Sequence, residues 1–110
     1  MRTVYPVFIK NIDNKYYSIY LPDFDTHTST EYLDLWEAFE MSRDLLNLMY
    51  VTNEDMEKAN PKPSTYGEAI VLARKHTEMG YSDYSNDLIT YVDIDTDEYR
   101  EFLKSIDTTK

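Results

Sequence analysis

The distribution of apolar and polar residues along the first thirty positions predicts three short strands. Residues 4–10 (VYPVFIK) and 16–21 (YYSIYL) are rich in β-branched and aromatic side chains, which favour pleated strands. The turn-forming residues 11–15 between them predict a hairpin. Pro6 has no amide hydrogen, so we expect it near the start of its strand or at a sheet edge. Residues 24–30 then predict a third, short strand.

Apolar residues recur every three or four positions after Asp34, which predicts an amphipathic helix. Asp34 and Glu37 have the spacing of a capping box, so the helix should begin there. Its expected apolar face consists of Leu35, Ala38, Phe39, Ser42, Leu45, Leu46 and Met49. Its expected polar face carries Glu37, Glu40, Arg43, Asp44 and Asn47. A helix with one apolar stripe needs a surface to cover, and the predicted sheet provides it.

A second helix is predicted after a polar connection. Residues 52–63 contain two prolines and few apolar side chains, which is typical of a loop. Thr65 and Glu68 then repeat the capping-box spacing. The helical pattern continues toward Gly80, which stands where a C-terminal cap glycine is expected.

The last part of the chain predicts one strand and one helix. Residues 88–94 (LITYVDI) are strongly β-type, and Asp95 can cap a helix whose first turn is acidic. The apolar face of that helix would be Tyr99, Phe102, Leu103 and Ile106. We therefore expect a single α+β domain over residues 1–110, in the order β-β-β-α-α-β-α. It would be a three-stranded antiparallel sheet plus a later fourth strand, packed by an amphipathic helix.

The net charge of the chain indicates what kind of partner it could bind. The 110 residues contain 21 acidic and 11 basic side chains, for a formal net charge of −10. Such a field repels phosphate and disfavours nucleic-acid binding by the whole surface, whereas it favours a basic partner. Charge alone is explained at least as well by solubility. The chain has no cysteine, no apolar run near the ~18 residues of a membrane span and no signal-peptide pattern, so we expect a soluble, cytoplasmic protein without a membrane partner.

The sequence contains fragments of metal-site motifs, but none of them is complete. Residues 93–97 have the D-x-D-x-D spacing that opens a calcium loop, but the required glycine and bidentate glutamate are replaced by Glu98 and Lys104. Asp13, Glu37 and Asp93 are candidates for a two-metal nuclease site, yet nothing in the sequence brings them together.

Nucleophilic and phosphate-binding chemistry find no support either. His27 and His76 have no adjacent nucleophile motif, and two glycines are too few for a phosphate-binding glycine loop. We expect a protein that is not an enzyme and that needs no metal or cofactor.

The tyrosines of the hairpin lie on both faces of the predicted sheet. Tyr16, Tyr17 and Tyr20 could stack RNA bases, but stacking platforms come with basic residues and these tyrosines have acids beside them. Core packing on one face and a protein interface on the other is the favoured interpretation.

Several of these elements, in this order, resemble HicB antitoxins. The matching parts are residues 4–9, the strand exit at 17–23 (YSIYLPD), Glu37-Ala38 at the helix start, Pro63-Ser64, and residues 91–100. The resemblance spans residues 4 to 100. It implies a partly RNase H-like fold without working catalytic carboxylates. It also implies a partner of the HicA type, a small basic toxin that cuts mRNA with a histidine.

The chain departs from the family pattern in three places. Family members often carry a glycine before the helix, where this chain has Glu31-Tyr32-Leu33. Many also carry a C-terminal DNA-binding domain, whereas this chain stops at Lys110, so we expect no separate DNA-binding domain and no direct operator binding. Residues 65–80 look longer than the minimal family domain, and their helix is expected to form an extra contact.

The sequence thus predicts an antitoxin-like module that neutralises a small basic HicA-type toxin by direct contact. Its predicted partner-binding residues lie around the exit of the second strand: Tyr20, Pro22, Asp23, Phe24, Asp25 and Glu31. Open sheet edges favour a homo-oligomer, a dimer or higher. Two alternatives stay open: an RNA-binding domain with a tyrosine-lined sheet, and a remnant RNase H-like nuclease.

Overall fold

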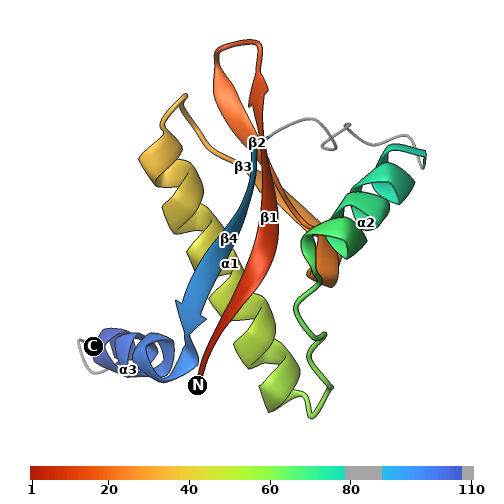
Figure 1. The fold of residues 1–110 in the computed structure, drawn as a ribbon. Coiled ribbons are helices and arrows are strands. Elements are labelled where there is room, and N and C mark those ends of the chain that lie inside the picture. Colours follow the sequence, from red (N-terminus) through yellow and green to blue (C-terminus); the bar gives the residue numbers. More distant parts are fainter. Residues whose placement is uncertain (79–87, 108–110) are drawn as a thin grey trace.

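A four-stranded antiparallel sheet in the order β3-β2-β1-β4 forms the centre of the molecule (Figure 1). The computed structural model describes residues 1–78 and 88–107. The strands are β1 (Arg2–Ile12), β2 (Tyr16–Leu21), β3 (Thr26–Ser29) and β4 (Leu88–Asp95), and a 3-10 turn η1 (Pro22–Phe24) joins β2 to β3. The three predicted N-terminal strands are confirmed, and the late strand joins their sheet by pairing with β1.

The β1–β2 hairpin is held by a tight turn whose residues tolerate positive φ. Asp13 and Asn14 have φ of 53° and 55°, a region that short polar side chains visit more readily than others. Pro6 pairs with Tyr91 of β4, and the pairing of β1 with β2 begins only at Phe8. Pro6 therefore lies in a central strand and not at a sheet edge, in the part of β1 that β4 alone pairs with.

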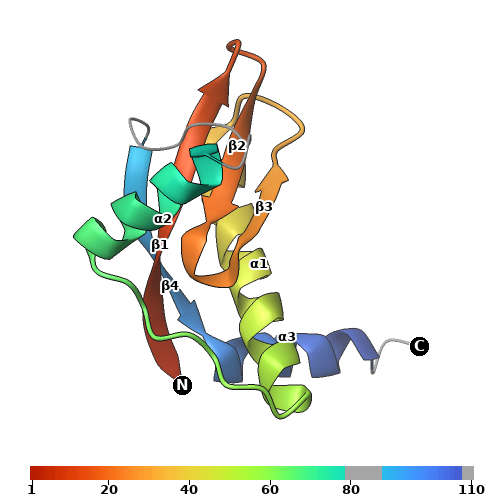
Figure 2. The ribbon, with the colours of Figure 1, turned by 90° about the vertical axis from the view of Figure 1, so that its right-hand side faces the viewer.

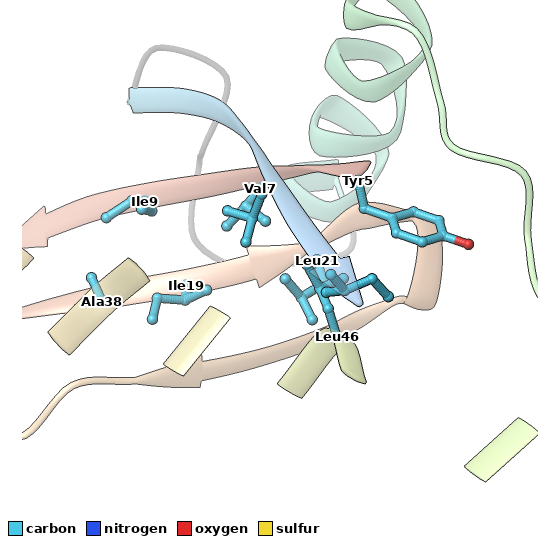
Figure 3. Close-up of a cluster of buried hydrophobic side chains, with 9 residues drawn as sticks. Tyr5, Val7, Ile9, Ile19, Leu21, Ala38 and Leu46 are labelled. Atoms are coloured by element: carbon cyan, nitrogen blue, oxygen red, sulfur yellow. The ribbon is translucent and has the colours of Figure 1, made fainter. Parts of the chain in front are cut away.

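Helix α1 (Leu35–Asp55) covers one face of the sheet. Ala38 and Leu46 are buried, and they close a core with the inward side chains of β1, β2 and β4 (Figure 3). The buried members of that core are Tyr5, Val7, Ile9, Ile19, Leu21, Ala38, Leu46, Val92 and Ile94. The helix runs on to Asp55, past the predicted loop start at residue 52. Its predicted sheet-facing stripe is confirmed at its centre, while Leu35 at its start is exposed.

Helix α2 (Tyr66–Glu78) covers the opposite face, as the two ribbon views agree (Figures 1 and 2). Ala69 and Ala73 pack on Phe8 and Tyr20. Their small side chains let the helix approach the sheet closely. A helix of the same chain therefore covers this face of the sheet around Tyr20. The predicted cap at Gly80 and the following residues to 87 lie outside the described residues.

The connection between the two helices is tied to the sheet by a buried tyrosine. The Tyr5 hydroxyl donates a hydrogen bond of 2.7 Å to the carbonyl oxygen of Pro61. Burial, with the neighbouring Tyr50 and Asp23, raises the pKa of Tyr5 to about 12. The hydroxyl therefore stays protonated and remains a donor over the physiological pH range.

Helix α3 (Thr96–Asp107) follows β4 without a loop and lies beside α1, on the side of the molecule away from α2 (Figure 2). The carboxylate of Asp95 accepts hydrogen bonds from the backbone amides of Asp97 and Glu98, so the predicted cap is confirmed. The predicted order β-β-β-α-α-β-α is also confirmed. Among the helices of the described residues, none has the length and apolar character needed to cross a bilayer.

Candidate partner-binding surface

Four of the six predicted partner-binding residues are engaged inside the fold. Tyr20 is 3 % exposed and Pro22 is buried. The carboxylate of Asp23 accepts hydrogen bonds from the backbone amide and the hydroxyl of Ser64, which fixes the start of the α2 segment. Phe24 packs edge-to-face on Tyr5, with 4.9 Å between ring centroids.

The other two, Asp25 and Glu31, are exposed and lie at opposite ends of β3. Asp25 ends the η1 turn with φ of 46°. The Glu31 backbone amide donates to the Glu37 carboxylate at 3.1 Å. Contact of these six residues with a partner stays a prediction.

Two histidines and a tyrosine meet where α2 packs on the sheet. The ring of His76 stacks on Tyr20 at 4.0 Å and meets His27 edge-to-face at 5.9 Å. Burial lowers the pKa of His76, the nearby His27 lowers it further, and the charge of Asp25 opposes both. The cluster packs α2 against the sheet, and burial favours the neutral form of the His76 imidazole.

The three nuclease candidates belong to separate elements. Asp13 lies in the hairpin turn and Glu37 in the first turn of α1. Asp93, in β4, forms an ion pair of 2.8 Å with Arg43, whose hydrogen bond lowers the pKa of that carboxyl group. Over residues 1–78 and 88–107, no group of three His, Cys, Asp or Glu side chains is placed to hold a metal ion.

A surface that the sequence prediction missed lies between α1 and α3. One hollow of about 350 Å³ has a mainly apolar lining, including Leu48 of α1 and Phe102 of α3. These two side chains are 48 % and 57 % exposed. The lining residues are Thr28, Met41, Asp44, Leu45, Leu48, Tyr99 and Phe102.

A second hollow of about 380 Å³ adjoins it and shares Asp44, Tyr99 and Phe102. Its other lining residues are Arg43, Asn47, Asp93, Asp95 and Glu98. We refer to the two hollows together as the α1–α3 groove. It has an apolar half and an acidic half, joined at Phe102.

Asn47, which lines the acidic half of this groove, does not lie where the helical pattern predicted. It was expected on the polar face of α1, but it is 6 % exposed. Its side-chain oxygen is buried, and no hydrogen-bond donor reaches it from the described residues. The periodicity of α1 alone could not show this, because a later element, α3, packs beside that face.

Comparisons with known proteins show a likeness in fold and not in sequence family. No protein-family model matches the chain, and no curated protein matches it at a significant level. A chain of a toxin–antitoxin complex from Streptococcus pneumoniae superimposes with a TM-score of 0.70 over 90 % of this chain and 73 % of that chain. The two are 21 % identical in sequence. This likeness establishes a shared α+β fold.

Proposed function

We propose that this protein is an antitoxin-like binding module that neutralises a small basic toxin of the HicA type by direct contact. The observation that carries the proposal is the shared fold with a chain of a toxin–antitoxin complex, over nine-tenths of the present chain. The HicB-like strand exit and helix start point the same way independently. The net charge of −10 suits a basic partner.

The alternative of RNA binding is less well supported, because base stacking needs accessible rings. Of the three tyrosines expected to stack on bases, Tyr20 is buried, and Tyr16 and Tyr17 are half-buried. The hydroxyl of Tyr91, whose side chain is more exposed, is bound to the carbonyl of Ser64. A filter-binding assay with single-stranded RNA at low salt should give no retention, and saturable retention would favour this alternative.

Homo-oligomer formation is a separate part of the proposal. Strands β3 and β4 form the two edges of the sheet, and unpaired edges are common sites of strand pairing between chains. Light scattering of the purified chain should give a mass above that of one 13.1 kDa chain. A monomeric mass over the whole concentration range would remove this part alone.

The toxin-binding proposal is tested with the product of the reading frame adjacent to this gene. We expect a small basic protein that co-purifies with the tagged chain and elutes with it as one species in size-exclusion chromatography. The matched control is the same toxin with an unrelated acidic protein of similar size. Separate elution of the two proteins, or the absence of a basic neighbour, would contradict the proposal.

A further inference from the structure

We propose that the α1–α3 groove is the toxin-binding surface, and that it takes a basic amphipathic segment of the toxin, with an apolar side chain next to lysine or arginine. The inference rests on the proposed function and assigns the toxin contact to a particular surface. It moves the contact from the predicted β2 exit to the outer side of α1 and α3.

The apolar half of the groove supplies the first reason. Helix α3 leaves large parts of its apolar side chains exposed, with Phe102 at 57 %, Leu103 at 37 % and Ile106 at 48 %. Leu48 of α1 adds an exposed apolar side chain next to Phe102. Amphipathic helices normally bury such a face, and contiguous exposed apolar surface marks interaction sites. Aromatic side chains at the centre of an interface are frequent binding anchors.

The acidic half supplies the second reason. Asp93 and Asp95 are each matched by one cation, Arg43 and Arg2. Asp44 and Glu98 have no ion pair with any described residue. Arg43 is the one basic side chain among the residues that line the groove. The groove is therefore short of positive charge, which a lysine or arginine of a partner would supply.

Asn47 supplies an independent third reason. Its side chain is more than nine-tenths buried, it lines the acidic half, and its oxygen has no donor within the described residues. A buried acceptor without a donor is costly. A guanidinium or ammonium group entering this hollow would bring a donor to the side where the amide lies.

Charge also decides against a second copy of this chain as the occupant. Another copy carries the same net charge of −10. The bases that α3 could offer are already paired, Arg100 with Glu54 and Asp55, and Lys104 with Glu101. A basic toxin supplies what a second copy lacks.

The test uses the full chain and the adjacent-frame toxin in a surface-binding assay that resolves association and dissociation rates. Phe102→Asp and Leu48→Asp should each raise Kd about tenfold or more, through faster dissociation, as expected for an anchor. The double variant Asp44→Lys/Glu98→Lys should mainly slow association. Because these side chains are exposed, the variants should keep the wild-type circular dichroism and melting temperature. If Phe102→Asp or Leu48→Asp fails to fold, the Kd of the other single variant tests the inference.

Two matched controls separate this surface from the others. Val71→Asp changes a similarly exposed apolar residue, 51 % exposed, on α2 across the sheet. Asp25→Lys/Glu31→Lys reverses the two exposed acids of the predicted β2-exit site. Both variants should bind the toxin with a Kd within about twofold of the wild-type value, since surface changes away from a contact have small effects.

The outcomes are distinguishable. If the wild-type chain does not bind the toxin, the proposed function fails and the inference fails with it. If the wild type binds and the groove variants bind equally well, the groove inference alone is overturned, and loss in Asp25→Lys/Glu31→Lys would restore the β2-exit site. If light scattering shows that Phe102→Asp dissociates an oligomer of the chain alone, the groove holds a second copy and the inference is overturned.

Discussion

At the scale of single residues, the contact between His76 and Tyr20 couples the position of α2 to the protonation of one imidazole. Burial lowers the pKa of His76 below the 6.5 of an unperturbed histidine. The unfolded chain therefore takes up this proton at a higher pH than the folded one. The stabilising contribution is complete above about pH 6.5 and is lost as the pH falls through the lower folded-state pKa.

The free energy of unfolding, measured with urea, should therefore fall as the pH is lowered from 7.5 to 5. This interval spans the pKa of ~6.5 of a free histidine. The variant His76→Phe keeps an aromatic ring but has no proton to gain. Its pH dependence should be flatter than that of the wild type over the same interval. Equal slopes for the two proteins would show that His76 does not carry the effect.

A second prediction at this scale compares two leucines of α1. Leu46 is fully buried in the main core, and Leu48 is exposed in the groove. Leu46→Ala should lower the free energy of unfolding by about 2–5 kcal/mol, because it leaves a cavity. Leu48→Ala should change it by no more than about 0.5 kcal/mol. Chemical denaturation of both variants measures this, and a large loss in Leu48→Ala would contradict the exposed placement.

At the scale of elements, the starts of the helices were the features most accurately predicted. Thr65 and Glu68 exchange the two hydrogen bonds of a capping box, the backbone amide of each donating to the side chain of the other. Asp34 caps α1 by accepting from the amides of Trp36 and Glu37. Local rules hold here because the partners are three residues apart at most. The Glu37 carboxylate departs from the box and binds the Glu31 amide.

The cap of α1 gives a prediction of its own. Asp34→Ala should lower the free energy of unfolding by about 1 kcal/mol, because two backbone amides lose their acceptor. Asp34→Ser should retain most of the stability, since serine caps nearly as well. Thermal or urea unfolding measures the difference, and equal stability of the alanine and serine variants would contradict a capping role.

What the sequence could not predict depends on contacts between distant elements. The covering of Tyr20 by α2 and the burial of Asn47 both involve segments far apart in the chain. The apolar face of α3 was predicted from its spacing, but its exposure was not, since a periodic pattern says which side is apolar and not whether anything covers it. The candidate groove could for this reason be found only in the folded molecule.

At the scale of the whole molecule, the net charge of −10 should act on the rate of association with a basic partner. Charges on exposed surfaces are screened over about 10 Å at 0.1 M salt and over about 3 Å at 1 M. Association with the toxin should therefore slow as salt is added, while dissociation changes little. Stopped-flow measurement across this range checks it, and an association rate independent of salt would contradict the electrostatic part of the account.

The most direct measurement of the central claim is neutralisation in growing cells. The adjacent small basic reading frame is placed under one inducible promoter and this chain under another. Inducing the toxin alone should arrest growth, and inducing both should restore it; Val71→Asp should restore it as well, and Phe102→Asp should not. Continued arrest with the wild-type chain present and folded would contradict the claim that this protein neutralises a toxin.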